Sequence, residues 1–183
     1  GPVAAVTAIK QLGTNGGGLI RYRDGRFQAY TTANGLSHDH IRALYEDRAG
    51  NLWVTDIPHG RIFKVSPSGD WTLAAQYDGW PNGLKFHKDG RGFITDYKRG
   101  IMTLDTASGK VTPLIETVRS ESFKGVNDLH FALNGDLYFT DQGQTGIVDP
   151  TGRVYRLKEN GDLQRLASNI PSPNGITDST TDK

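Results

Sequence analysis

The sequence predicts an all-β protein built of four-stranded antiparallel units, and three observations support this. The phrases GNLWVTD (50–56), GRGFITD (90–96) and GDLYFTD (135–141) repeat a glycine, alternating apolar residues and a final Thr-Asp, at spacings of 40 and 45 residues. Further short alternating runs, joined by glycine turns, follow each phrase, as expected for strands linked in hairpins. The 3.6-residue apolar period of an amphipathic helix is absent, so the units are predicted to contain strands alone.

A four-stranded unit of about 40–50 residues cannot cover both of its own faces, so such units stack around an axis as the blades of a β-propeller. We expect one domain over 1–183, with about four blades per chain. The expected blades are 3–32 (partial), 40–77, 81–117 and 126–168, with 173–176 as a closing strand. An incomplete ring exposes a sheet edge and a blade face, which favours closure by a second copy in a homodimer. A four-bladed monomer is the alternative.

Composition and charge exclude several classes of partner. The 183 residues, 36% of them hydrophobic, suffice for the core of one ordinary domain. Lysine and arginine number 21 against 20 acidic residues, without a basic run, so nucleic acid is not an expected partner. No apolar stretch reaches the length of a membrane helix and no signal peptide is visible, so we expect a soluble protein of unknown compartment and no membrane partner. The absence of cysteine excludes disulfides and thiolate metal sites.

Polar residues recur at the start of the expected innermost strand of each unit. Asn82, Asn127 and Asn174 are equivalent in the repeat, and Asp128 follows Asn127. The first residues of innermost strands line the channel of a propeller, and amide and carboxylate oxygens suit a hard cation. In the alternative interpretation, these residues supply turn geometry and hydrogen bonds from side chain to backbone at the channel rim.

Four phrases resemble the lactonase propellers of the senescence-marker-protein, gluconolactonase and luciferin-regenerating-enzyme-like group: PNGLKFHKDGRGFITDYKRGI, FKGVNDLHFALNGDLYFTDQGQTG, GRVYRL and SNIPSPNGI. The resemblance runs from about Asp56 to Ile176. The preceding segment, 16–54, resembles instead the propeller repeat of periplasmic sensor domains in two-component regulators. The chain therefore looks composite. Natural truncation, fusion or engineered assembly of propeller pieces would each give this pattern.

The lactonase resemblance implies a six-bladed ring with one divalent cation in its channel, commonly calcium, with magnesium, zinc or iron in some members. The cation would polarise the carbonyl of a sugar lactone and activate water for ring opening. By this resemblance Asn174 matches the asparagine of a metal-binding PNG turn, while Asn127 and Asp128 match an ND pair that contacts metal or substrate. The expected cation ligands are therefore Asn174, Asp128 and Asn127. Asp128 is the catalytic candidate, and Asn127 and Asn82 are the substrate-binding candidates.

The sequence departs from the family pattern at two ligands. The family's glutamate stands in an EGP-type first strand, and no glutamate has that context here. After PNGI (173–176) the chain reads TDSTTDK, without the aspartate expected from a following blade. We therefore expect a folding and self-assembling scaffold with weak or no catalysis, and with either one divalent cation or none. The alternatives are a metal-dependent lactone hydrolase, acting as an oligomer on a small sugar lactone, and a ligand-sensing propeller module.

Other polar residues are predicted to serve the scaffold. Asp56, Asp96 and Asp141 end the three repeated phrases, and repetition in every unit favours a structural hydrogen bond over catalysis. His38 and His40 have the spacing at which two imidazoles on one strand face share a metal, but no third ligand is evident.

Four large aromatic side chains lie within or beside the expected strands: Trp53, Trp71, Trp80 and Phe93. Aromatic side chains bury a large apolar area, and the spaces between propeller blades are filled by such groups. We therefore predict that all four pack between blades and that none forms a platform for a ligand.

Overall fold

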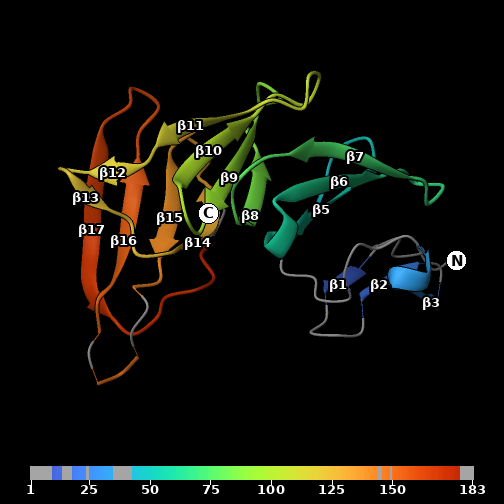
Figure 1. The fold of residues 1–183 in the computed structure, drawn as a ribbon, viewed down its shortest axis with the longest axis horizontal. Coiled ribbons are helices and arrows are strands. Elements are labelled where there is room, and N and C mark those ends of the chain that lie inside the picture. Colours follow the sequence, from blue (N-terminus) through green and yellow to red (C-terminus); the bar gives the residue numbers. More distant parts are fainter. Residues whose placement is uncertain are drawn as a thin grey trace, which may run out of the picture.

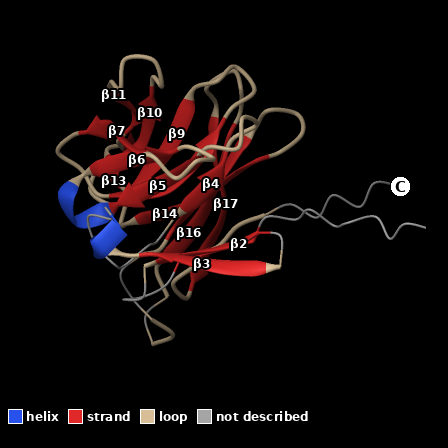
Figure 2. Cartoon of the chain, turned by 90° about the vertical axis from the view of Figure 1, so that its right-hand side faces the viewer, coloured by secondary structure: helices blue, strands red, loops and turns tan. Residues whose placement is uncertain are grey.

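The computed structural model describes residues 10–13, 18–23, 25–34, 43–143, 146–148 and 150–177. These residues form seventeen β-strands and two single-turn 3-10 helices, η1 (Thr32–Asn34) and η2 (Ile57–His59). Figure 2 shows the two helical turns beside layers of strands. Within the described ranges, no helix is long and apolar enough to cross a membrane. The predicted all-β fold class is confirmed.

Three four-stranded antiparallel sheets follow one another along the chain, each with its strands in sequence order. The first contains β4 (Leu44–Glu46), β5 (Leu52–Asp56), β6 (Arg61–Val65) and β7 (Trp71–Gln76). The second contains β8 (Pro81–Phe86), β9 (Gly92–Asp96), β10 (Gly100–Leu104) and β11 (Val111–Ile115). The third contains β14 (Val126–Phe131), β15 (Leu137–Asp141), β16 (Gly152–Leu157) and β17 (Leu163–Ile170).

Two smaller sheets complete the described fold. A three-stranded sheet precedes the others and contains β1 (Lys10–Gly13), β2 (Leu19–Arg23) and β3 (Arg26–Tyr30). A short hairpin of β12 (Thr117–Val118) and β13 (Glu121–Ser122) lies between the second and third large sheets in the chain. The sheets succeed one another along an arc, from β1–β3 through β4–β7 and β8–β11 to β14–β17 (Figure 1).

The glycine that opens each repeated phrase closes the turn between the first and second strands of a sheet. Gly50, Gly90 and Gly135 have φ of 78°, 90° and 88°. Each also donates its backbone N–H to the carbonyl three residues earlier. Residues with a Cβ rarely adopt this left-handed conformation, which explains why glycine recurs at this position.

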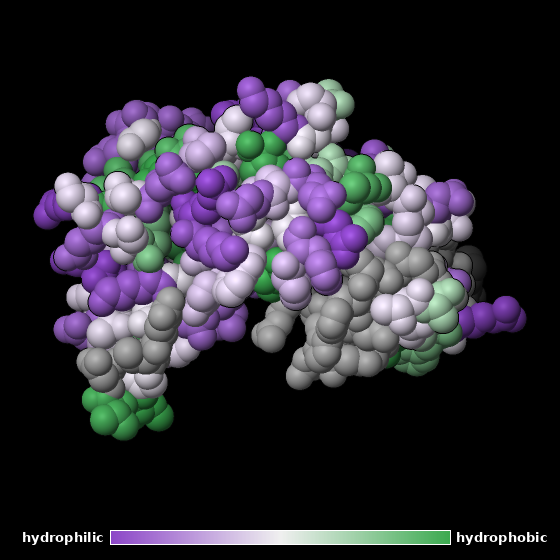
Figure 3. Space-filling view, viewed as in Figure 1, coloured by the Kyte–Doolittle hydropathy of each residue, from purple (hydrophilic) through white to green (hydrophobic). Residues whose placement is uncertain are grey.

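The core lies between consecutive sheets, as expected for stacked blades. Trp53 and Ile62 of the first sheet pack with Ile94 and Met102 of the second, and Phe93 of the second packs with the third. The second strand of each four-stranded sheet is almost wholly buried because it has neighbours on both faces. Each large apolar side chain buried in this way stabilises the fold by about 1.5–3 kcal/mol. Hydrophilic residues cover much of the surface in view, and the hydrophobic patches between them are small (Figure 3).

The threonine of each repeated phrase links its sheet to the start of the next repeat. Its hydroxyl donates to the backbone carbonyl of the next asparagine in three pairs: Thr55 to Asn82 (3.1 Å), Thr95 to Asn127 (2.6 Å) and Thr140 to Asn174 (2.7 Å). The three asparagines are therefore equivalent in space as well as in sequence. We call this contact the threonine latch.

The segment 173–177 occupies the position of a first strand but does not form one, although the sequence predicts a closing strand at 173–176. The equivalent stretches β8 and β14 are strands because each pairs with the strand that follows it. No described strand follows 173–176, so no ladder is seen for this stretch among the described residues. It is held instead by the threonine latch at Asn174 and by a bond from Ile176 N to Asp128 Oδ2 (3.1 Å).

The aspartate of each phrase makes structural hydrogen bonds, as predicted. Asp56 accepts from Arg61 Nε (2.9 Å), and Asp141 accepts from Lys124 N (2.9 Å). Asp96 is fully buried and accepts from four donors. They are Tyr77 OH (2.7 Å), Trp80 N (2.7 Å), Lys98 N (2.9 Å) and Arg99 N (2.9 Å). The carboxylate thus ties the loop before β8 to the loop after β9.

Candidate functional site

Asp128 lies near the start of β14, where the chain departs from a regular ladder. The pairing of β14 with β15 shifts register between Val126 and Leu129, and such irregularities re-aim side chains at the end of a strand. The Asp128 carboxylate accepts Leu129 N at Oδ1 (2.9 Å) and Ile176 N at Oδ2 (3.1 Å). Each carboxylate oxygen has two acceptor positions, so each keeps one for a cation or another donor.

Asn127 is buried beside Asp128 and is held by a chain of polar side chains. Its Nδ2 donates to Gln142 Oε1 (2.9 Å), and Gln142 Nε2 donates to Ser172 Oγ (2.8 Å). Asp128 N donates to Thr140 Oγ1 (3.1 Å), the hydroxyl of the third threonine latch. The third sheet and the segment 173–177 thus form one hydrogen-bonded network around Asp128.

The structure brings together some of the predicted site residues. Asn127, Asp128 and the backbone of Asn174 share the network, whereas the Asn174 side chain is exposed. Asn82 lies on the neighbouring strand β8 and is joined to Thr55 by its backbone carbonyl, outside the network around Asp128. The predicted metal pair, His38 and His40, lies outside the described residues.

Sequence reasoning missed Gln142, Ser172 and the role of Thr140. Thr140 belongs to the repeated Thr-Asp phrase, so the repeat itself carried a signal for it. Gln142 directly follows that phrase, at a position where the three repeats carry different residues. This variation beside an otherwise repeated phrase is the feature of the sequence that could have pointed to Gln142. Its bond to Ser172 joins residues thirty positions apart, and no local pattern reveals such a pairing.

The oxygen groups around Asp128 suit a hard cation in type but fall short in number. Calcium takes six to eight oxygen ligands. Among the described residues, the network contains the carboxylate of Asp128, the side-chain amides of Asn127 and Gln142, and the hydroxyls of Thr140 and Ser172. In the described part of the chain, no three His, Asp or Glu side chains gather where they could hold a metal ion. These residues can therefore form part of a cation site, and no chemical step is assigned to such an ion.

Asp141 is buried next to this network and differs from its equivalent, Asp96. Its Oδ1 accepts Lys124 N, whereas its buried Oδ2 has no hydrogen-bond partner among the described residues. Burial raises the pKa of Asp141 above its ordinary value, against the opposing effects of the Lys124 amide and the Arg153 cation. A carboxyl shielded from solvent in this way fits a role in the scaffold.

Comparison with known proteins gives both relatives and structural neighbours. The model of the SMP-30/Gluconolactonase/LRE-like region matches residues 43–183. A lactonase drp35 from Staphylococcus aureus is 32% identical over 152 residues, which cover 78% of this chain and 46% of that protein. The chain thus spans less than half the length of this relative. Because the family match begins at residue 43, the resemblance of 16–54 to a sensor-domain repeat stays a prediction.

Solved structures resemble the chain in fold. Virginiamycin B lyase from Staphylococcus aureus has a TM-score of 0.68 at 21% identity, over 89% of this chain and 53% of that one. Regucalcin from Agrobacterium tumefaciens, a calcium-binding protein, has a TM-score of 0.57 at 19% identity, over 71% of this chain and 43% of that one. At these identities the likeness shows the fold alone, and it agrees with the predicted propeller blades. Since the family model matches most of the chain, this protein belongs to the SMP-30/Gluconolactonase/LRE-like family.

Proposed function

We propose that the chain supplies part of the ring and part of the cation-binding rim of a lactonase-type propeller. Without other proteins, the chain folds and assembles with copies of itself as a scaffold, and its hydrolysis of lactones is weak or absent. The observation that carries this proposal is the environment of Asp128. Both of its carboxylate oxygens already accept a backbone amide, and among the described residues no group of three His, Asp or Glu side chains forms that could hold a metal ion. Fewer charged ligands lower the affinity for a divalent cation, and with it the activation of bound water.

Hydrolysis of gluconolactone, followed by proton release in a pH-stat with and without calcium, tests the catalytic part of the proposal. We expect rates close to those of the buffer. The Asp128→Ala variant should bind calcium at least roughly tenfold more weakly in calorimetry, because it loses the carboxylate at the centre of the network. Asp162→Ala, in the turn between β16 and β17, is the control and should leave calcium affinity unchanged. Enzyme-like turnover would refute the scaffold assignment, and unchanged calcium affinity in Asp128→Ala would refute the ion-binding role.

We also propose that two copies of the chain close the ring. The β1–β2–β3 sheet has three described strands where the other blades have four, and the segment 173–177 lies as a first strand without its ladder. Pairing of this segment with the three-stranded sheet of a second copy would complete both.

Light scattering at micromolar concentration tests the closure. The expected molar mass is twice the 20.0 kDa of one chain. A variant that ends at Ser172 should lose the dimer, because it lacks the pairing segment. A stable monomer, or a dimer that survives this truncation, would contradict the proposal.

A further inference from the structure

Trp80 is exposed, although the sequence predicts that it packs between blades. Trp53 and Phe93 are 3% and 6% exposed, whereas Trp80 is 38% exposed. Its backbone is nevertheless fixed, because Trp80 N donates to Asp96 Oδ2 (2.7 Å) and Trp80 O accepts Tyr97 N (3.0 Å). An indole side chain is thus presented to solvent from a rigid frame, just before β8 begins.

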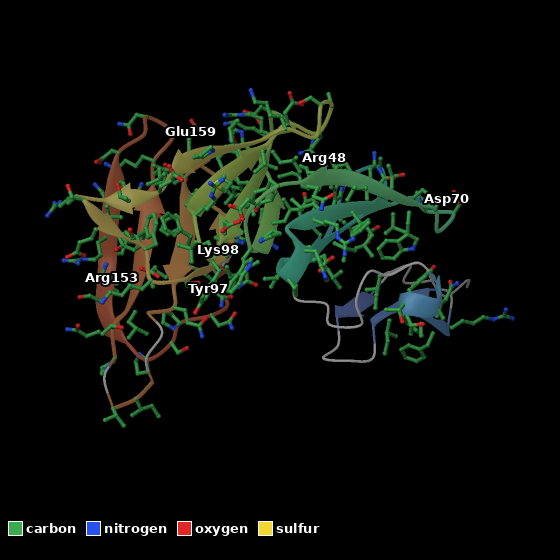
Figure 4. All side chains as sticks on the ribbon, viewed as in Figure 1. Arg48, Asp70, Tyr97, Lys98, Arg153 and Glu159 are labelled. Carbon is green, nitrogen blue, oxygen red and sulfur yellow. The ribbon has the colours of Figure 1, made fainter. Side chains whose placement is uncertain are left out.

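Tyr97 and Lys98 accompany Trp80. The rings of Trp80 and Tyr97 stack with centroids 6.1 Å apart and planes at 28°. Lys98 Nζ lies 4.7 Å from the centre of the Trp80 ring. Its ion-pair partner is the exposed Asp78, at a long 3.9 Å, and exposed pairs of this kind hold a side chain weakly. Tyr97 and Lys98 lie beside each other near the middle of the view (Figure 4).

This aromatic pair adjoins the candidate site. Gly125 stands two residues before Asn127 and has a φ of 121°. A Cβ at Gly125 would come within 2.5 Å of Tyr97 Cε2, so the Tyr97 ring lies directly against this backbone. The platform formed by Trp80, Tyr97 and Lys98 therefore lies at the same end of the strands as Asn127 and Asp128.

The scaffold does not account for these three side chains. When Asp96 is aligned with Asp141, Trp80 corresponds to Gly125, Tyr97 to Gln142 and Lys98 to Gly143. Another blade thus builds the same positions with two glycines and a glutamine. That glutamine bonds Asn127, whereas the aromatic residue at the same repeat position, Tyr97, lies against Gly125, two residues before Asn127.

We propose that Trp80, Tyr97 and Lys98 form a subsite that binds the ring of a polyhydroxylated lactone and the carboxylate of its hydrolysis product. This deepens the proposed function and rests on it. The C–H groups of a saturated ring carry slight positive charge and are attracted to the negative face of an aromatic ring. A ring stacked on Trp80 takes the place of the Lys98 ammonium. The ammonium then turns on its flexible stem toward the carbonyl or carboxylate oxygen.

Binding of gluconate, followed by NMR titration, tests the subsite without any need for turnover. Trp80→Ala should weaken gluconate binding by about tenfold, because it removes the stacking surface. Phe27→Ala, which removes another exposed aromatic side chain on β3, is the control and should bind like the parent protein. Lys98→Met should weaken binding of gluconate but not of neutral methyl glucoside, whereas Trp80→Ala should weaken both. Circular dichroism checks that each variant is folded, and Lys98→Met tests the subsite even if Trp80→Ala unfolds.

Failure of this proposal and failure of the proposed function give different results. The subsite is refuted if the parent protein does not bind gluconate. It is also refuted if folded Trp80→Ala or Lys98→Met binds gluconate as tightly as the parent protein does, whatever the lactonase assay shows. A different result would separate the two proposals. If gluconate binding depends on Trp80 and Lys98 but calcium affinity does not depend on Asp128, the subsite is supported and the cation-binding rim is refuted.

Discussion

Replacing Asp96 by asparagine is expected to lower the free energy of unfolding by about 3 kcal/mol, because the buried carboxylate accepts two donors on each oxygen. The asparagine side chain has one oxygen, which accepts hydrogen bonds, and one NH₂ group, which does not, in place of the two carboxylate oxygens. Two of the four donors are then left without an acceptor. Urea denaturation of the variant, with the midpoint and slope fitted together, measures the loss.

Asp141→Asn is the matched control, since Asp141 ends the equivalent strand and its Oδ2 has no donor among the described residues. The asparagine oxygen can still accept Lys124 N, and its NH₂ replaces the unpartnered oxygen. We therefore expect a change within about 1 kcal/mol. An Asp141→Asn loss as large as that of Asp96→Asn would contradict this account of the two carboxylates.

The Asp141→Asn variant also has a defined pH dependence. Because burial raises the pKa of Asp141 in the folded state, that state holds the proton more tightly than the unfolded chain does. The resulting stabilisation is present below the ordinary pKa of an aspartate and is lost as the pH rises through the raised value. Asp141→Asn should remove this component of the fall in stability with pH.

Replacing Thr95 by valine is expected to cost about 2 kcal/mol. The fully buried hydroxyl accepts Gly83 N (2.8 Å) and donates to Asn127 O (2.6 Å), so it joins the second sheet to the first strand of the third. Valine has nearly the same shape but leaves both backbone groups buried without their partner.

Thr103→Val is the control for the threonine latch. The Thr103 hydroxyl bonds Thr112 Oγ1 (2.9 Å) within a single sheet at a partly exposed position, where water can replace the lost bond. Its cost should stay below about 1 kcal/mol. Equal losses in the two variants, measured by urea denaturation, would show that the latch adds nothing to the contact between blades.

The strands could be predicted from the sequence because their signals are local. The glycines at 50, 90 and 135 mark turns that need a positive φ, and the alternating residues after them mark strands with one apolar face. The equivalence of Asn82 and Asn127 also followed from the repeat. The structure adds the physical link, a threonine hydroxyl on the preceding blade.

The remaining features depend on contacts between distant residues. A strand at 173–176 requires a pairing partner, and the composition of the segment does not indicate whether one is present. The exposure of Trp80 depends on the packing of the loops before β8 and after β9. The local sequence shows only an aromatic residue beside a strand, and this pattern is typical of the core. The Gln142–Ser172 bond likewise arises only when the chain returns to β15 after β17.

A calcium titration of the isotope-labelled protein, followed by NMR, tests most directly whether the rim around Asp128 binds a cation. The account predicts chemical-shift changes concentrated at the backbone amides of Leu129 and Ile176, which donate to the Asp128 carboxylate, and at the side-chain amide of Asn127, the residue next to Asp128 in the chain. Changes confined to exposed hairpin carboxylates such as Asp105, or no changes at millimolar calcium, would contradict it.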